Sequence, residues 1–502
     1  MTEPGGTQPA AGAPHSTGTP SWQQGPPWQV RSQLIDGVPR EAEGAEVIQS
    51  VDPATGQSVG SAVAATGAEV ERAVAAARAA GPGWRARSAG ERAATLRAAA
   101  AAVRADAERL ARLHTRDTGR LLRDARAAVD AAAGLLCEAA EHGPLDAGRA
   151  LGGGPGAVDL VRREPRGVVA LITPWNDPYP AAAGLLAAAL VTGNTVVHKP
   201  SERSPLAGRA FAELVATAVP PGVLNVLSGG AATGALIVAH PDVDVVAHVG
   251  SSAAGEAIAT AAGPRAVRLL LENGGKDALI VDRDVDVAWA AGQAARGAFT
   301  NAGQLCVSVE RMLVHRDVAA AFLDALVLMA SAWAVGDPAD DATRLGPLVD
   351  ERAVAGVLAQ LDDAVRRGAT VLCGGGRADR RGCYLNATVV SDCTEEMSLW
   401  TEETFGPVAA VRRVSSFEQA LEEAGRSGYG LAATVLTGSM AHALAAVDAL
   451  EVGTVKVNDV FGGAPGGSAD PRRRSGTGRG YGPDLIGELT TLKTVHLAAP
   501  AR

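Results

Sequence analysis

The sequence predicts an α/β fold in which mostly parallel sheets are covered by helices on both faces. From Gly167 onward, apolar runs of strand length alternate with helical runs, and a second alternating block extends from about Lys276 to Val457. Such alternation is typical of parallel sheets. The chain of 502 residues is too long for one simple core, so we expect two or three domains.

The N-terminal part is expected to contain a tail and two helices. Residues 1–28 are rich in Pro, Gly, Gln, Ser and Thr and lack an apolar segment, which predicts a disordered tail and no signal peptide. Within Ala64–Leu113, two alanine-rich helical segments carry arginine and glutamate on their outer face. Gly81-Pro82-Gly83 is expected to separate these two helices.

The two alternating blocks predict individual elements. The strands expected in the first block are Val168–Ile172, Thr195–His198, Val223–Leu227, Val245–Val249 and Ala266–Leu271. Helices are expected near Ala181–Val191, Leu206–Ala218, Ala231–His240 and Ala253–Ala262. The second block predicts strands at Ala278–Val281, Arg311–Val314, Val408–Val414 and Thr454–Val457, and the β-branched Thr490–Leu497 predicts a terminal strand.

Composition excludes several classes of protein. The net charge of −9, scattered arginines and 3% aromatic residues argue against nucleic acid as a partner. The longest apolar stretch, Ala181–Val191, is too short to span a bilayer, so no membrane partner is expected. The five cysteines lack paired or metal-ligand spacing, which predicts no metal site and a reducing, cytoplasmic location.

A cysteine and a glutamate are the candidate reactive residues. Cys306 ends Phe299-Thr300-Asn301-Ala302-Gly303-Gln304-Leu305-Cys306, and Glu272 lies in Leu271-Glu272-Asn273-Gly274-Gly275-Lys276. A thiolate can attack a carbonyl carbon, and a carboxylate can activate the water that releases the product. Their separation of 34 positions (306 − 272) proves nothing alone, so the interpretation depends on the neighbouring motifs.

Two glycine-bearing turns predict a nucleotide site. Gly250-Ser251-Ser252-Ala253-Ala254-Gly255 follows a predicted strand and opens a helix, and Gly229-Gly230-Ala231-Ala232-Thr233-Gly234 lies one unit earlier. Helix N–H groups at such turns favour a pyrophosphate, although an ordinary strand-to-helix turn explains each equally well in isolation.

Polar residues after two further strands extend this interpretation. Lys199 and Glu202 can both reach ribose hydroxyls, and the carboxylate would repel a 2′-phosphate, which favours NAD over NADP. A surface ion pair is an equally good explanation of these two residues. The amide of Asn176 can donate a hydrogen bond to an alkoxide, or it can stabilise a turn between prolines.

Together these motifs resemble those of the aldehyde dehydrogenase superfamily, of the NAD(P)-dependent hydrolytic type, from about Trp28 to the C-terminus. They stand in the family's order, which carries far more weight than any single motif. The motifs are Pro174-Trp175-Asn176, Lys199-Pro200-Ser201-Glu202, Gly250-Ser251, Leu271-Glu272-x-Gly274-Gly275-Lys276, Gly303-Gln304-x-Cys306, Glu402-Glu403-x-Phe405-Gly406-Pro407 and Ser475-Gly476-x-Gly478-Arg479.

The resemblance implies a role for each matched residue. Cys306 would form a thiohemiacetal with an aldehyde, Asn176 and the Cys306 N–H would hold the oxyanion, and Glu272 would activate water to hydrolyse the thioester. The cofactor would be NAD, with NADP left open. The residues implied in binding it are Trp175, Lys199, Glu202, Gly230, Gly250, Ser251, Gly255, Glu403 and Phe405.

The resemblance also implies an architecture: a Rossmann-like cofactor-binding domain, an α/β catalytic domain and a small β oligomerisation element. The first would comprise residues 29–145 and 167–272, the second residues 273–470, and the third residues 146–166 and 471–502. Strand addition through the third element would bury exposed edges, so we expect a homodimer or homotetramer.

Four departures from the family pattern concern the substrate tunnel. Asp177 replaces the usual Phe or Tyr and Gly184 replaces a bulky residue, which together suggest a wide, anionic tunnel and a cationic or bulky aldehyde. Alternatively, Asp177 caps the helix beginning near Ala181 or faces solvent. Asn273 replaces the usual apolar residue beside Glu272, and the Ser468–Arg474 loop is longer and richer in arginine than expected. The sequence does not predict how either change alters the tunnel.

Two other functions compete with aldehyde oxidation to the acid. A CoA-acylating semialdehyde dehydrogenase would pass the acyl group to CoA, and Glu272 argues against this because such an enzyme has less need of a water-activating base. A catalytically silent, nucleotide-binding structural relative is disfavoured because Cys306, Glu272 and Asn176 are all present.

Overall fold

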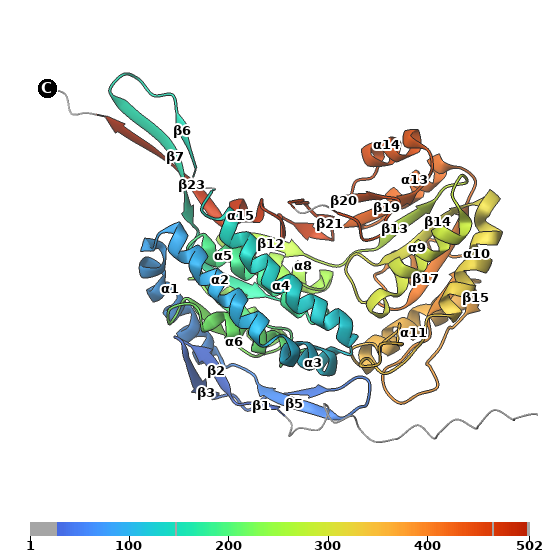
Figure 1. Cartoon of the computed structure of the whole chain (residues 1–502), viewed down its shortest axis with the longest axis horizontal. Helices are drawn as coiled ribbons and strands as arrows, with labels where there is room; N and C mark the ends of the chain where they lie inside the picture. The colour runs from blue at the N-terminus through green and yellow to red at the C-terminus, as the bar shows by residue number, and fades with distance from the viewer. Residues whose placement is uncertain (1–27, 146–147, 464–465, 499–502) are drawn as a thin grey trace, which may run out of the picture.

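The computed structural model describes residues 28–145, 148–463 and 466–498. The predicted tail therefore lies outside the described residues, except for Trp28, which begins β1 (Trp28–Val30). Two large sheets stand in separate lobes, and a narrow β arm projects from the first lobe (Figure 1). The predicted α/β class is confirmed. In the described parts of the chain no helix is long and apolar enough to cross a membrane.

The first lobe is built on an eight-stranded sheet with the order β22-β12-β11-β8-β9-β10-β2-β3. The five central strands run parallel, and β22, β2 and β3 pair antiparallel at the edges. Their bounds are β2 Ser32–Ile35, β3 Val38–Glu41, β8 Val168–Ile172, β9 Thr195–Lys199, β10 Leu224–Val226, β11 Val245–Val249, β12 Arg268–Glu272 and β22 Gly476–Thr477. All five predicted strands of this block are confirmed, with β8 and β11 at the predicted bounds.

Helices cover both faces because alternate residues of each strand point to opposite sides. In β8, Val169 and Leu171 join the core beneath α2–α6, whereas Val168 and Ala170 join the core beneath α1, α7 and α8. The helices are α1 Gly67–Ala86, α2 Ala89–Ala105, α3 Ala107–Thr118, α4 Leu122–His142, α5 Pro178–Val191, α6 Ala207–Ala216, α7 Ala231–Ala239 and α8 Ser252–Ala262. A separate sheet of β1, β4 (Val47–Val51) and β5 (Ser58–Val63) precedes them.

The prediction that Gly81-Pro82-Gly83 separates two helices is wrong. Helix α1 continues through Pro82 to Ala86, and the break comes at Ser88, which forms a capping box with Glu91 at the start of α2. The buried Trp84 holds the last turn of α1 in place, because its indole N–H donates to the Leu190 carbonyl at 3.1 Å. Tertiary packing therefore overrides the local helix-breaking signal.

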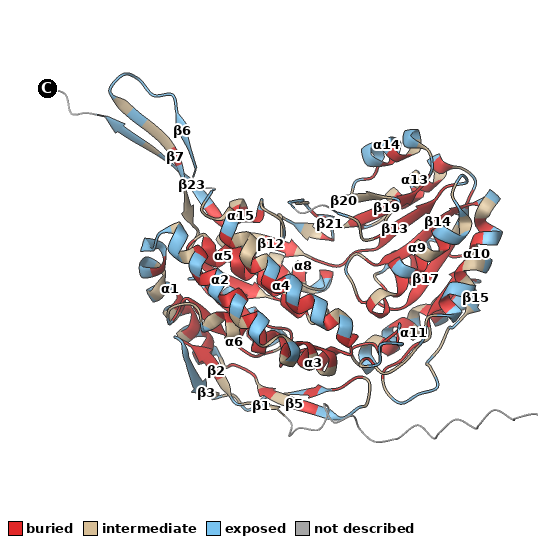
Figure 2. Cartoon of the chain, in the orientation of Figure 1, coloured by how far each residue is buried: buried red, intermediate tan, exposed pale blue. Residues whose placement is uncertain are grey.

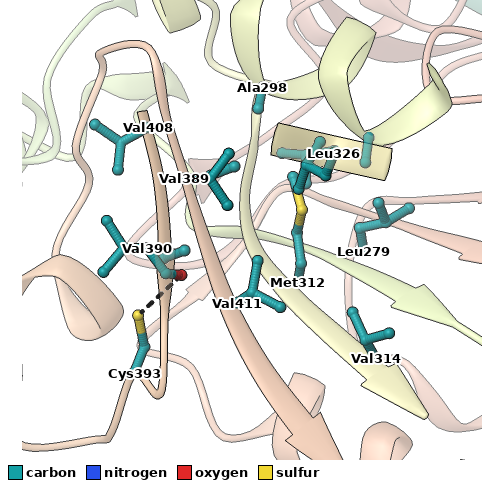
Figure 3. Close-up of a cluster of buried hydrophobic side chains, with 14 of the residues drawn as sticks. Leu279, Ala298, Met312, Val314, Leu326, Val389, Val390, Cys393, Val408 and Val411 are labelled. Carbon is teal, nitrogen blue, oxygen red and sulfur yellow. Dashed lines mark hydrogen bonds between the residues drawn. The ribbon is translucent and has the colours of Figure 1, made fainter. Parts of the chain in front are cut away.

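The second lobe contains a seven-stranded sheet with the order β15-β16-β17-β14-β13-β19-β20. Leu279, Met312, Val389 and Val411 come from four neighbouring strands and pack against Leu326 of α10 (Figure 3). The strands are β13 Asp277–Val281, β14 Val309–His315, β15 Thr370–Cys373, β16 Thr388–Ser391, β17 Val408–Val414, β19 Ala432–Leu436 and β20 Thr454–Val457. The helices are α9 Val287–Phe299, α10 Arg316–Ser331, α11 Glu351–Arg366, α12 Ser398–Thr401, α13 Phe417–Gly425 and α14 Met440–Ala449. The four predicted strands are confirmed, whereas β15, β16 and β19 were not predicted.

The arm is a three-stranded antiparallel sheet of β6 (Gly148–Leu151), β7 (Ala157–Pro165) and β23 (Thr490–Ala498). It confirms the predicted C-terminal strand. Much of the arm is exposed in the single chain (Figure 2). The short helix α15 (Leu485–Glu488) joins the arm to the first lobe, and β18 (Tyr429–Gly430) pairs with β21 (Arg472–Arg473).

Candidate active site

Cys306 and Glu272 line the same cavity, whose volume is about 280 Å³. Helix α4 and helix α5 form one wall, and the segment from Gly480 to Ile486 forms another. The sequence separates these residues widely, and the fold brings their segments together just after β12, where a Cβ on Gly275 would lie 2.7 Å from the Cys306 carbonyl oxygen. Gly184 lines the cavity as expected and leaves room that a larger side chain would occupy.

The backbone before Cys306 follows an unusual path that presents the thiol to the cavity. After α9, Asn301, Ala302 and Gly303 have successive φ values of 52°, 55° and 73°, all in the left-handed region. This region is costly for residues with a Cβ, and such strain is concentrated at functional sites. A Cβ on Gly303 would overlap the carbonyl oxygen of Gly406, so only glycine fits there. Cys306 itself is exposed.

Gln304 anchors this strained segment. Its buried amide oxygen accepts a hydrogen bond from the Val349 N–H at 2.9 Å, and its amide nitrogen donates to the Asn301 carbonyl at 3.0 Å. The Asn176 amide donates to the Gln304 carbonyl at 2.9 Å. The side chain of Asn176 therefore lies alongside the segment that ends at Cys306.

The thiol of Cys306 is protonated near neutral pH. The sulfur is accessible from the cavity, but protein atoms take the place of most of the water that would surround a thiol in solution. This burial, together with the negative charges of Asp277 and Glu272, raises the pKa of the Cys306 thiol to about 12. The thiol therefore needs a base to remove its proton as it attacks.

Glu272 is suited to act as that base. Burial raises the pKa of its carboxyl to about 7, while a hydrogen bond from the Gly480 N–H, 2.7 Å from Oε1, acts in the opposite direction. Its position is fixed because β12 pairs with β22, with Glu272 opposite Gly476. A carboxylate half-ionised near neutrality can both accept and release protons.

Lys199 and Glu202 form an ion pair, with Nζ 3.3 Å from Oε2. Lys199 is only 3% exposed, and its ammonium also donates to the Gly229 carbonyl at 2.8 Å. Burial lowers the pKa of Lys199, and Glu202 opposes this effect. The lysine thus links the end of β9 to the first glycine-bearing turn.

The two glycine-bearing turns place helix N-termini at the carboxyl ends of parallel strands. Gly230 precedes α7, and a Cβ there would meet open space. Ser251 caps α8 by accepting a hydrogen bond from the Ala254 N–H at 3.3 Å. At Gly250, a Cβ would lie 2.6 Å from the His248 ring, so the strand-to-helix turn requires glycine there. Two open helix N-termini suit the pyrophosphate of a dinucleotide.

Gly255, which was also predicted to belong to the cofactor site, lies in the first turn of α8. It is buried in α8, where a Cβ would overlap the amide of Asn273. Its function is close packing of helix against strand. Asn273 in turn holds the following loop, because its amide donates to the Arg474 carbonyl at 3.0 Å.

Glu403, Phe405 and Trp175 lie together near the Gly275 turn. Glu403 Oε1 accepts a hydrogen bond from the Gly275 N–H at 3.1 Å. The ring of Phe405 meets that of Trp175 edge-to-face, with centroids 5.6 Å apart. The backbone of Phe405 has a φ of 50°, a strained conformation that the surroundings must hold in place.

Glu310 supplies that support, and the sequence analysis missed it. Its carboxylate accepts hydrogen bonds from the N–H groups of Thr404 and Phe405 at 2.8 and 2.9 Å, and from the Lys276 ammonium at 2.8 Å. Both charged side chains are buried. The available signal was an acidic residue directly before the predicted strand Arg311–Val314.

The prediction that Asp177 makes the tunnel anionic is wrong. Its carboxylate lies 3.3 Å from the guanidinium of Arg120 and does not line the cavity. Asp177 occupies the N-cap position of α5, but its side chain makes no capping hydrogen bond. The acidic residue that the sequence analysis missed is Glu138 of α4, which does line the cavity.

Fold and site together define an α/β protein whose cavity holds an accessible cysteine and a buried glutamate beside a dinucleotide-type sheet. Comparison with known proteins agrees. The pattern of the aldehyde dehydrogenase family matches residues 40–495. The chain therefore belongs to the aldehyde dehydrogenase family, whose members are NAD(P)-dependent enzymes that oxidise aldehydes.

Related proteins align with nearly the whole chain. The chloroplastic betaine aldehyde dehydrogenase of Amaranthus hypochondriacus is 37% identical, covering 93% of this chain and 95% of its own. The peroxisomal aminoaldehyde dehydrogenase 2 of Pisum sativum is 38% identical over 89% of this chain and 92% of its own. The crystal structure of an NAD-dependent aldehyde dehydrogenase from Sinorhizobium meliloti superposes with a TM-score of 0.92 at 32% identity, covering 96% of this chain and 97% of the other.

Proposed function

We propose that the protein is a cytoplasmic, NAD-dependent dehydrogenase that oxidises a cationic aldehyde to its carboxylic acid. The observation that carries this proposal is that Cys306 and Glu272 line one cavity next to a dinucleotide-type sheet. The cationic substrate is supported by the names of the relatives, which act on betaine aldehyde and aminoaldehydes. The room left by Gly184 is consistent with a bulky ammonium group.

The reaction begins when the Cys306 sulfur bonds to the aldehyde carbon and the thiol proton moves to the carboxylate of Glu272. The carbonyl oxygen becomes an alkoxide, which the Asn176 amide and the Cys306 N–H stabilise by hydrogen bonds. A bound NAD would supply the two-electron acceptor needed to oxidise the thiohemiacetal to a thioester. Glu272 releases the thiol proton to solvent through the open cavity and then deprotonates a water molecule, whose oxygen attacks the thioester carbon. The acid is released and the thiol of Cys306 is regenerated.

The cofactor is held by residues at the carboxyl ends of the first sheet and by the turn beyond Gly275. Lys199 and Glu202 would bind the adenosine ribose and Glu403 the nicotinamide ribose, and Phe405 would pack at that end beside Trp175. The two helix N-termini after Gly230 and at Gly250-Ser251 receive the pyrophosphate. The Lys199–Glu202 ion pair favours a free 2′-hydroxyl, because a 2′-phosphate would meet the Glu202 carboxylate.

The domain organisation follows the same reasoning. Residues 29–145 and 167–272 form the NAD-binding domain, residues 273–470 the catalytic domain, and residues 146–166 with 471–502 the oligomerisation element. Within the described residues, the edge strands β6 and β23 of the arm each pair on one side only, so pairing with a second copy gives a homodimer or homotetramer.

Hydrolysis rather than acyl transfer to CoA is favoured by the placement of Glu272 at the cavity with Cys306. The test is NADH formation from a panel of aldehydes without CoA, with product analysis for the free acid. Turnover to free acid is expected from the wild type and none from Cys306→Ser. A strict requirement for CoA would instead establish the acylating enzyme, and no turnover of any aldehyde would favour a silent relative.

A further inference from the structure

We infer that Glu138 of helix α4 receives the positive charge of the substrate. It would bind an ammonium group at the end of the aldehyde chain opposite the carbonyl. This inference rests on the proposed function and names the residue that selects a charged substrate for the same cavity.

One face of α4 forms part of the cavity wall. Leu135, Glu138, Ala139 and His142 line it, and their spacing of three, four and seven positions places them on one side of a helix. Cys306 and Glu272 line the same cavity. Cys306 and Glu138 therefore border one cavity that is open to solvent on one side.

The charges around the cavity favour a cation. Glu138 and Glu272 are the acidic residues among those that line it, and among the described residues no lysine or arginine does so. Glu272 is occupied as the proposed base beside the reacting carbon. Glu138 is then the carboxylate left to bind a distant ammonium group, and an aldehyde with a terminal carboxylate would be repelled.

Asp177, the acidic residue suggested by the sequence, does not compete for this role. Its carboxylate is paired with Arg120 and lies outside the cavity lining. Glu138 differs from Asp177 in this respect. Among the described residues its one ion-pair partner is His142, with 4.0 Å between Glu138 Oε1 and His142 Nδ1. The Glu138 side chain is 37% exposed, so a ligand can reach it.

The remaining walls suit the rest of such a molecule. Leu135, Leu485 and Ile486 offer apolar contacts to a methylene chain. The ring of Tyr481 also lines the cavity, and its hydroxyl lies 3.2 Å from that of Thr454. An aromatic face can contribute further to binding an alkylated ammonium group.

The test uses two substrates of equal shape, 4-(trimethylammonio)butanal and its uncharged tert-butyl isostere 5,5-dimethylhexanal. In Glu138→Gln, kcat/KM for the cation is expected to fall about tenfold through a higher KM, because the charge pair forms equally in the ground and transition states. The uncharged isostere should be unaffected. Glu141→Gln is the matched control, since Glu141 lies on the same helix, is exposed and does not line the cavity.

A binding measurement separates this inference from the proposed function. The unreactive alcohol 4-(trimethylammonio)butan-1-ol should bind the wild type about tenfold more tightly than Glu138→Gln by calorimetry, whether or not any aldehyde is turned over. Equal losses for the charged and uncharged aldehydes, or unchanged binding of the alcohol, would overturn the role of Glu138. Turnover of no aldehyde with intact binding of the alcohol would overturn only the proposed function.

Discussion

The backbone N–H of Gly480 donates a hydrogen bond to Oε1 of Glu272 at a distance of 2.7 Å. The bond favours the ionised carboxylate, whereas burial favours the protonated form, and the balance leaves the pKa of Glu272 at about 7. A Cβ at position 480 would overlap the side chain of Glu272, so glycine is required for this contact. The Gly480 N–H thus helps to hold the proposed base in place and opposes the effect of burial on its pKa.

The first prediction concerns the pH dependence of the rate. Because Glu272 must be ionised to accept a proton, kcat should rise with pH through about 7 and then level off. Replacement by glutamine should lower kcat at least about 100-fold and remove this inflection. Steady-state rates from about pH 5 to about pH 9 measure both effects, and a wild-type profile flat across neutrality would contradict them.

The second prediction is a stability effect of the same group. The folded protein binds the Glu272 proton more tightly than the unfolded chain, whose glutamate pKa is near 4.5. The stabilisation is complete below about pH 4.5 and is lost as pH rises through about 7. Glutamine stays uncharged at every pH, so Glu272→Gln should change the free energy of unfolding more favourably near pH 8 than near pH 5. The difference between the two effects should be on the order of 1–3 kcal/mol. Denaturant titrations at both pH values test this, and an equal effect at the two would refute it.

Much of the fold could be predicted because buried parallel strands are continuous apolar runs. Val168–Ile172 is such a run and was predicted at its observed bounds. Val245–Val249 and Val408–Val414 were also predicted at their observed bounds, although His248 and the pair Arg412-Arg413 interrupt their apolar residues. Helix α4 was not predicted, and α1 was expected to end too early, because alanine-rich sequence carries little periodic contrast. Trp84 decides the end of α1 through a contact with Leu190, which local pattern cannot reveal.

Residues of the candidate site could be predicted only where they belong to a motif of consecutive residues. Cys306 and Glu272 lie in such motifs and share the cavity. The pairing of Asp177 with Arg120 joins residues far apart in the sequence, so the charge of Asp177 was misjudged. The close approach of Gly255 to the Asn273 side chain joins α8 to the segment after β12, and glycine spacing alone could not reveal that contact.

The third prediction concerns the reactivity of Cys306. Because burial and nearby carboxylates raise the pKa of its thiol to about 12, alkylation of the enzyme alone by iodoacetamide should be slow near neutral pH. The rate should rise steadily with pH toward about 10. Site-resolved mass spectrometry separates Cys306 from the half-buried Cys137, which serves as the internal control. A rate at Cys306 that is already maximal near pH 7 would show a preformed thiolate and contradict this view.

The last prediction concerns the buried pair of Glu310 and Lys276. Glu310→Gln leaves the Lys276 ammonium buried without a counter-charge, so the free energy of unfolding should fall by about 3–5 kcal/mol. Adding Lys276→Met removes the stranded charge and should restore part of this loss. Denaturant titration measures both variants, and Glu422→Gln, which breaks an exposed pair with Arg426, should cost less than about 1 kcal/mol.

The same two variants separate stability from cofactor binding. The Glu310 carboxylate accepts hydrogen bonds from the backbone N–H groups of Thr404 and Phe405, one on each oxygen. The glutamine side chain has a single, uncharged oxygen, which is a weaker acceptor for these two N–H groups. The Glu310→Gln, Lys276→Met protein should therefore regain stability but still bind NAD several-fold more weakly, because Phe405 is no longer held at its left-handed φ of 50°. Calorimetric titration with NAD measures this. Wild-type affinity in the double variant would mean that the Phe405 backbone is held by its other contacts, and Glu310 would then contribute to folding alone.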